Sequence, residues 1–150
     1  MELTYDVIMD FTKKYFDMLK TIRPKEDPTI IDRIKNFFAS DFQIRWDEPP
    51  VLWDRKQWVD HLCGHSEEYI AHVIYEPYPL MLWVDDRKKV VGAFIREEAR
   101  HPKTNSLLKV FLIVANFELK LENGEPKFWR ELIAFTPGMY SSDVIPKGEK

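Results

Sequence analysis

This sequence of 150 residues lacks cysteine pairs, long apolar runs and glycine-rich motifs. Its one cysteine, Cys63, excludes a disulfide within the chain, which suits a reducing compartment. The longest apolar runs, Leu80–Val84 and Val110–Ala115, are far too short to span a bilayer. Neither a glycine-rich phosphate loop nor a Gly-x-Ser-x-Gly turn occurs, so nothing supports nucleotide-dependent or serine-hydrolase chemistry.

Charge of one sign is not concentrated anywhere in the chain. The net charge is −3, and 22 lysines and arginines are scattered among 25 acidic residues. Nucleic-acid binding calls for a basic face, which this pattern does not provide. Met1 and Glu2 lead directly into an amphipathic pattern without the features of a secretory leader. We therefore expect a cytoplasmic protein that binds neither nucleic acid nor membrane.

Aromatic residues, in contrast, are abundant. The chain has ten Phe, six Tyr and five Trp, and 45% of its residues are hydrophobic. This composition excludes disorder and indicates a large aromatic core or an aromatic-lined cavity. The length suits one domain covering residues 1–150, since no linker interrupts the pattern.

The first half of the sequence predicts helices. Apolar residues at helical spacing predict an amphipathic helix from Thr4 to Ile22, ended by Pro24. Asp27-Pro28 predicts the start of a second helix, whose apolar stripe ends near Ser40. A third helix is predicted from a capping box of Asp54 and Gln57 to a C-cap at Gly64.

The second half predicts long β-strands. Three are expected at Val90–His101, Leu107–Leu121 and Lys127–Thr136, joined by the turn sequences Pro102–Ser106 and Asn123-Gly124. Strands of this length after several helices indicate a highly curved antiparallel sheet. Shorter strands are expected at Phe42–Trp46, Tyr69–Tyr75 and Leu80–Val84.

This order of elements resembles that of the NTF2-like proteins, also called SnoaL-like or ketosteroid-isomerase-like. The resemblance covers nearly the whole chain and rests on element order and apolar pattern. It implies an α+β cone in which N-terminal helices pack on a curved, mainly antiparallel sheet that encloses a pocket. It also implies a homodimer through the outer sheet face. The apolar pattern agrees, because Leu107–Leu121 is apolar on both faces.

Two segments resemble those of the limonene epoxide hydrolases. Arg96-Glu97-Glu98 is similar to an Arg-x-Asp strand motif, and Trp129-Arg130-Glu131-Leu132 is similar to a Trp-Arg-Asp-Tyr segment, with Glu replacing Asp. The resemblance implies that Glu131 activates a water, Glu98 protonates the epoxide oxygen and Arg96 bridges them. Strand alternation places Arg96 and Glu98 on one face, and Glu131 on the face of Trp129. The alternative for the three is an ordinary cross-strand ion-pair network.

Two further residues resemble catalytic groups of the ketosteroid isomerases. Tyr15 is similar to their helix-borne oxyanion tyrosine, and Asp47, followed by Glu48-Pro49, to their catalytic base. The second oxyanion acid is missing, because Ala115 stands where it is expected. The alternative for Tyr15 is a core tyrosine with a satisfied hydroxyl group.

Several aromatic residues are candidates for the pocket lining, where they would contact an apolar ligand. These are Trp46, Trp58, Tyr75, Trp83, Phe117 and Trp129. His61, Cys63 and His65 lie close together in sequence, but Gly64 interrupts their predicted helix and a fourth ligand is not evident. We therefore expect no metal and no other cofactor.

The sequence thus predicts a protein that holds a small, largely apolar organic molecule. Cofactor-free acid–base chemistry of the hydrolase, isomerase or dehydratase type is the leading hypothesis, carried by Arg96, Glu98 and Glu131. The alternative is a non-catalytic module that binds a ligand or another protein.

Overall fold

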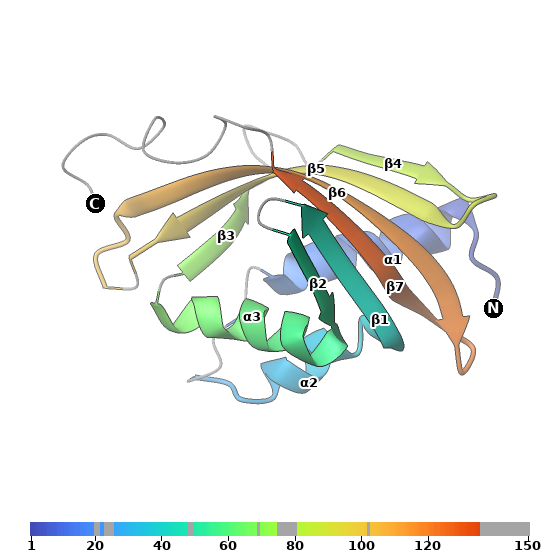
Figure 1. The fold of residues 1–150 in the computed structure, drawn as a ribbon, viewed down its shortest axis with the longest axis horizontal. Coiled ribbons are helices and arrows are strands. Elements are labelled where there is room, and N and C mark those ends of the chain that lie inside the picture. Colours follow the sequence, from blue (N-terminus) through green and yellow to red (C-terminus); the bar gives the residue numbers. More distant parts are fainter. Residues whose placement is uncertain are drawn as a thin grey trace.

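The computed structural model describes residues 1–19, 22, 26–47, 50–68, 70–74, 81–101 and 103–135. These residues form three helices, α1 (Tyr5–Leu19), α2 (Ile30–Lys35) and α3 (Arg55–Glu68), and one seven-stranded sheet. Figure 1 shows the sheet as an arch with the helices on its concave side. The strands are β1 (Phe38–Asp47), β2 (Pro50–Asp54), β3 (Ile70–Ile74), β4 (Met81–Asp85), β5 (Val90–Arg100), β6 (Leu107–Glu122) and β7 (Glu125–Phe135).

The strand order along the sheet is β2-β1-β7-β6-β5-β3, and β4 pairs with β5 beside β3. Every pairing is antiparallel except that of β1 with β7. The expected α+β class, with helices on a curved and mainly antiparallel sheet, is confirmed. None of the helices in the described ranges is long and apolar enough to cross a membrane.

An aromatic core fills the space between α1 and the sheet. Tyr15 of α1 packs against Phe117 of β6 and Phe128 of β7, with ring centroids 5.9 and 5.2 Å apart. Phe117 and Phe128 lie 4.5 Å from each other, and all three side chains are almost completely buried. Burial of such rings is a large stabilising contribution, since each removes roughly 150–250 Å² from water.

The second predicted helix is wrong in its extent. The helix α2 ends at Lys35, and Phe38 begins β1 instead of closing a helix near Ser40. Phe38 and Phe42 are both buried, and β1 pairs with β2 and β7, so sheet pairing overrides the helical spacing of these apolar residues. The strand β2 was not predicted; Pro50 is its first residue, a position that proline tolerates.

The third helix begins as predicted and ends later. Asp54 and Gln57 form the reciprocal capping box, with the Gln57 amide donating to Oδ1 of Asp54 at 2.9 Å and the Asp54 amide donating to Oε1 of Gln57 at 3.0 Å. Gly64 is not the C-cap, because α3 continues to Glu68. The predicted turn between β6 and β7 is confirmed, since Asn123 and Gly124 both have positive φ, 54° and 78°.

Candidate functional site

The pairing register separates the two glutamates that were expected to act together. Glu131 pairs with Phe117 of β6 and Ile44 of β1, and both neighbours belong to the buried core. Side chains alternate along a strand, so Glu98 lies on the face opposite to Ile95, which also belongs to the core. The sheet therefore stands between Glu131 on the concave face and Glu98 on the convex face. The expected arrangement, with Arg96 bridging two facing carboxylates, is not found.

Glu98 is instead held by two arginines of its own strand. Its Oε2 accepts a hydrogen bond from Nη2 of Arg96 at 3.0 Å, and its Oε1 accepts from Nη2 and Nε of Arg100 at 2.9 and 3.1 Å. Arg100 also donates to the carbonyl oxygen of Asn105. The carboxylate is only 8% exposed, so it is a buried charge compensated on two sides. These contacts form an ion-pair set within β5.

Glu131 has a contrasting environment. It is 6% exposed, and its Oε1 has no hydrogen-bond partner among the described residues. Burial raises the pKa of this carboxyl well above its ordinary value. A buried carboxylic acid in this state favours its protonated form and is equipped to donate a proton or a hydrogen bond.

A β-bulge moves Trp129 away from Glu131. The register shifts so that Glu118 pairs with Arg130, whereas the next residue of β6 pairs with Phe128, and Trp129 is the extra residue between them. The Trp129 ring lies 4.1 Å from the Arg130 guanidinium and 5.3 Å from Nζ of Lys120, both cation–π contacts. The expectation that Trp129 shares the face of Glu131 is therefore wrong.

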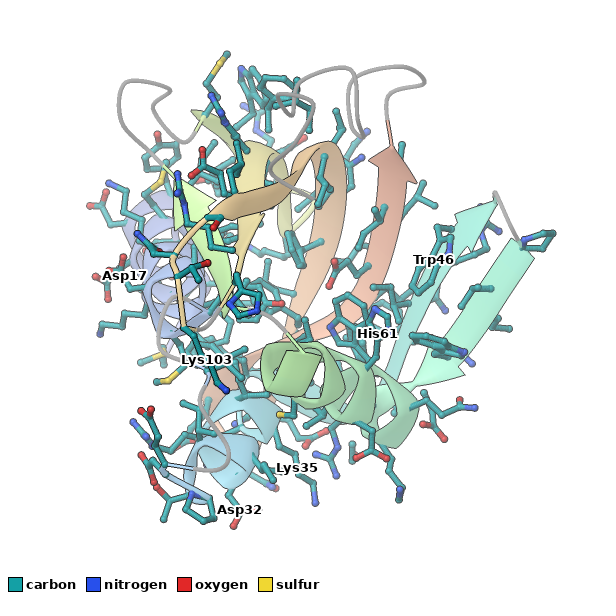
Figure 2. The ribbon with its side chains drawn as sticks, turned by 90° about the vertical axis from the view of Figure 1, so that its left-hand side faces the viewer. Asp17, Asp32, Lys35, Trp46, His61 and Lys103 are labelled. Atoms are coloured by element: carbon teal, nitrogen blue, oxygen red, sulfur yellow. The ribbon has the colours of Figure 1, made fainter. Side chains whose placement is uncertain are left out.

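Side chains from β1, β2 and α3 form a cluster of four rings, which we call the tryptophan cluster. It consists of Trp46 on β1, Trp53 on β2, and Trp58 and His61 on α3. Trp46 and Trp53 meet edge to face at 4.9 Å, and His61 stacks on Trp58 at 5.6 Å with 19° between the planes. Figure 2 shows Trp46 and His61 reaching toward each other in the space between α3 and the sheet.

The tryptophan cluster and Glu131 are neighbours through β1. Ile44 pairs with Glu131 and therefore points to the same face of the sheet. Trp46 follows Ile44 by two positions on the same strand, so the Trp46 side chain points to this face as well. Trp58 is 6% exposed, and its Nε1 has no hydrogen-bond partner within the described ranges. Glu131 and the tryptophan cluster together form what we call the interior site.

The other predicted residues are distributed over the molecule. Tyr15 and Phe117 belong to the aromatic core on the concave side, where Phe117 is the pairing partner of Glu131. Trp83 lies on the convex face and is 57% exposed. Tyr75 and the side chain of Asp47 lie outside the described part of the chain. The catalytic roles suggested for Tyr15 and Asp47 and the pocket-lining roles suggested for Phe117, Trp83 and Tyr75 stay predictions.

Two members of the tryptophan cluster, Trp53 and His61, were not in the predicted set. For His61 a weak pattern existed, because it follows Trp58 by three residues and such pairs share a helix face. No pattern marks Trp53, which joins the cluster through the unpredicted strand β2. Within the described ranges, no group of three or more His, Cys, Asp or Glu side chains is arranged to hold a metal ion. Burial raises the pKa of the Cys63 thiol, which disfavours its thiolate.

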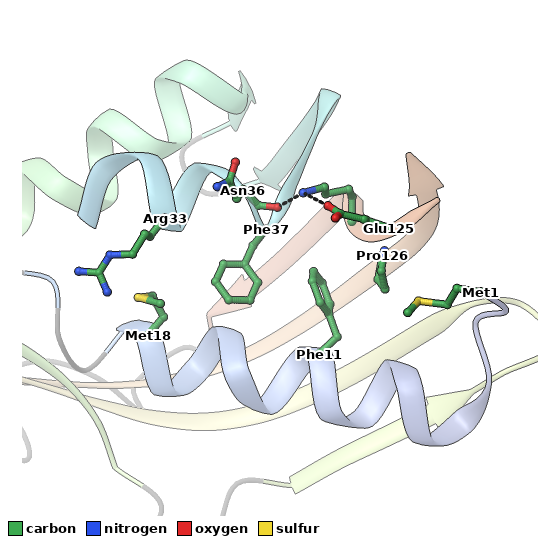
Figure 3. Close-up of a pocket in the computed structure, with 9 residues that line it drawn as sticks. Met1, Phe11, Met18, Arg33, Asn36, Phe37, Glu125 and Pro126 are labelled. Atoms are coloured by element: carbon green, nitrogen blue, oxygen red, sulfur yellow. Dashed lines mark hydrogen bonds and ion pairs between the residues drawn. The ribbon is translucent and has the colours of Figure 1, made fainter. Parts of the chain in front are cut away.

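An open groove lies between α1, α2 and the β6–β7 hairpin (Figure 3). Phe11 and Phe37 line it from two sides, and Lys127 at its rim donates to the carbonyl oxygen of Asn36 and pairs with Glu125. None of the described residues that line this groove belongs to the predicted site or to the interior site. Its charged groups already have partners, so we do not take it as the functional site.

No protein-family model matches the chain, and neither does any curated protein. Several solved structures match the chain. The epoxide hydrolase/cyclase-like enzyme SalBIII, described in pyran ring formation in the polyether salinomycin, is 12% identical, with a TM-score of 0.64 over 89% of this chain and 94% of that one. AusH from Aspergillus nidulans is 11% identical, with a TM-score of 0.66 over 89% and 86%. A protein of ketosteroid isomerase-like fold from Catenulispora acidiphila, solved with trimethylamine, is 8% identical, with a TM-score of 0.61 over 87% and 88%. Identities this low show the fold alone.

Proposed function

We propose that this chain, whose fold is NTF2-like, binds a small, largely apolar organic molecule at the interior site and acts on it by cofactor-free acid–base chemistry. The observation that carries the proposal is Glu131. A buried carboxyl group with an unpartnered oxygen is costly to a fold, and such groups gather at functional sites. A cytoplasmic location and a single domain over residues 1–150 are part of the proposal.

The state of Glu131 defines its role. A protonated carboxyl group donates its proton to a leaving oxygen, so that the carbon–oxygen bond of the substrate breaks without leaving a negative charge on that oxygen. In a ring opening or a cyclisation, a water or hydroxyl oxygen then forms the new bond at carbon, and its proton returns to the Glu131 carboxylate. In a dehydration, the carboxylate instead takes a proton from the neighbouring carbon as the carbon–carbon double bond forms. In each case one acid is regenerated without a cofactor. This cycle makes Glu131 a proton donor first, rather than the water-activating base that the epoxide hydrolase resemblance implied.

The structural neighbours support this class of chemistry. SalBIII is described as an epoxide hydrolase/cyclase-like enzyme. Tyr15 stays in the proposal as a second proton donor, because it lies on the concave side and its ring is 5.9 Å from that of Phe117, the pairing partner of Glu131. Arg96 and Glu98 are not part of the proposed mechanism, because the sheet separates their side chains from Glu131.

The proposal is tested by the titration of individual carboxyl groups, followed by NMR and assigned with the variants Glu131→Gln and Glu98→Gln. We expect the Glu131 carboxyl to titrate well above an ordinary glutamate, because burial disfavours its charged form. A Glu131 carboxyl that titrates like an ordinary glutamate contradicts the proposed acid.

The convex face of the sheet favours a second part of the proposal, a homodimer. Met81, Phe94, Val114 and Ala134 are paired in one row across four strands, and Trp83 and Leu132 lie in the next row. Met81, Trp83 and Leu132 are exposed, so apolar side chains of both rows are open to a partner, with Gly92 and Asn116 between Trp83 and Leu132 in the second row. An apolar sheet face of this kind is typical of an interaction surface, and it is also the observation that favours a protein-interaction module as the alternative function.

Val114→Glu tests the homodimer. The substitution places a charge in the middle of the apolar row, so we expect the protein to become monomeric, because a buried unpaired charge opposes association. Light scattering measures the mass. Leu52→Glu is the control, since it places the same charge at an exposed apolar position away from the row, on the edge strand β2. Unchanged dimer mass in Val114→Glu contradicts this placement of the interface.

A further inference from the structure

The indole of Trp58 is a buried donor at the interior site. Its side chain is 6% exposed, and Nε1 has no hydrogen-bond partner within the described ranges. An indole nitrogen only donates, so it cannot be satisfied by another donor. Buried donors of this kind are nearly always paired with protein or with a bound molecule, because leaving them unpaired costs free energy comparable to a lost hydrogen bond.

The surroundings of Trp58 are rings, and they hold the indole in place. His61 stacks on it at 5.6 Å, while Trp46 and Trp53 approach with ring centroids 6.0 and 6.5 Å away. Oε1 of Glu131 also has no hydrogen-bond partner within the described ranges. Glu131 pairs with Ile44 of β1, which lies two residues before Trp46. The interior site therefore offers an apolar, aromatic wall with hydrogen-bond donors in it.

We infer that Nε1 of Trp58 donates a hydrogen bond to an acceptor oxygen of the molecule bound at the interior site, which makes this molecule a neutral ketone, ether or epoxide. Burial among these rings disfavours an anionic acceptor, a cation has no lone pair to accept from the indole, and a hydrocarbon leaves the donor unpaired. An oxygen that only accepts satisfies the indole without adding a donor of its own. The inference rests on the proposed function, since it specifies the substrate class of the same site, and Trp58 becomes a residue that determines specificity.

Two probes of the same shape test the inference. Cyclohexanone carries an acceptor oxygen where methylenecyclohexane carries a CH₂ group. In ¹⁵N-labelled protein, the five tryptophans give five indole N–H resonances, and Trp58→Phe assigns the one from Trp58. We expect cyclohexanone, and not methylenecyclohexane, to move the Trp58 resonance downfield. In Trp58→Phe the affinity for cyclohexanone should fall about fivefold more than that for methylenecyclohexane, because only cyclohexanone loses a hydrogen bond.

Trp53→Phe is the matched control, because it alters a ring of the same cluster. We expect it to change the affinities for both probes alike. If both probes shift other indole resonances but the Trp58 resonance does not distinguish them, the inference is overturned, while the proposed binding of a small molecule at the interior site is supported. If neither probe shifts any indole resonance of the folded protein, the inference and the proposed binding site are both overturned. The four remaining indole resonances report whether Trp58→Phe is folded.

Discussion

Glu131→Gln is expected to abolish turnover and to stabilise the protein at alkaline pH. Glutamine matches the shape of a protonated glutamate but has no proton to give, so a general acid at this position is lost. General acid catalysis typically contributes a factor of about 10² to 10⁴, and we expect a decrease in this range. Since the side chain is buried among apolar neighbours, the isosteric amide should leave the fold intact.

The effect on stability follows from the direction of the pKa shift. Burial raises the pKa of Glu131 in the folded protein, whereas in the unfolded chain a glutamate titrates near about 4.3. The folded protein therefore retains a proton that the unfolded chain has released. The stability contributed by this group is fully present below about pH 4.3 and is lost as the pH rises through the raised pKa. Each pKa unit of elevation corresponds to about 1.4 kcal/mol of that loss.

Glu131→Gln has no such proton, so its free energy of unfolding should lack this decline with pH. Urea denaturation at several pH values from 4 to 9 measures the difference between variant and wild type. It should be small at the acid end and grow toward the alkaline end. Glu125→Gln, at an exposed position, is expected to follow the wild type throughout. A parallel pH profile for Glu131→Gln contradicts the buried acid, and a folded variant with full turnover contradicts its catalytic role.

The sequence predicts the elements of this fold better than the faces of its strands. The helix predicted for residues 4–22 and the turn at Asn123-Gly124 depend on local geometry, and the structure has α1 at Tyr5–Leu19 and the turn where it was predicted. The bulge at Trp129 depends on how β7 meets β6, which no local pattern encodes. One extra residue there changes which side chains share a face, and the prediction that Trp129 and Glu131 share one fails for that reason.

The same difference between local pattern and strand register decides which part of the candidate site was predictable. Glu131 was identified through its segment, and its burial follows from its pairing with Phe117 and Ile44. Glu98 was identified in the same way, yet alternation along β5 places it on the other face from Ile95, and only the register relates one strand's faces to another's. Trp53 lies on β2, a strand that was not predicted because it begins at a proline, Pro50, which usually ends a strand pattern.

Glu98→Gln is expected to destabilise the protein by about 2–3 kcal/mol. Removing the carboxylate leaves two guanidinium groups that are only partly exposed, with side-chain exposures of 21% for Arg96 and 29% for Arg100. Breaking a buried ion pair by removing one partner typically costs about 3–5 kcal/mol, and the partial exposure of the arginines reduces this cost. Because Glu98 faces away from Glu131, we expect the folded variant to retain its turnover.

Chemical denaturation at neutral pH and activity per folded molecule measure the two parts of this prediction. Asp60→Asn is the control for an exposed ion pair, since Asp60 pairs with Lys56 at 2.7 Å on the surface of α3, and its loss should destabilise the protein far less than the loss of Glu98. A triple variant that replaces Arg96, Glu98 and Arg100 by apolar residues should recover part of the lost stability, because it removes both arginines together with the carboxylate that pairs with them. Lost turnover in stable, folded Glu98→Gln contradicts the separation of the two glutamates by the sheet.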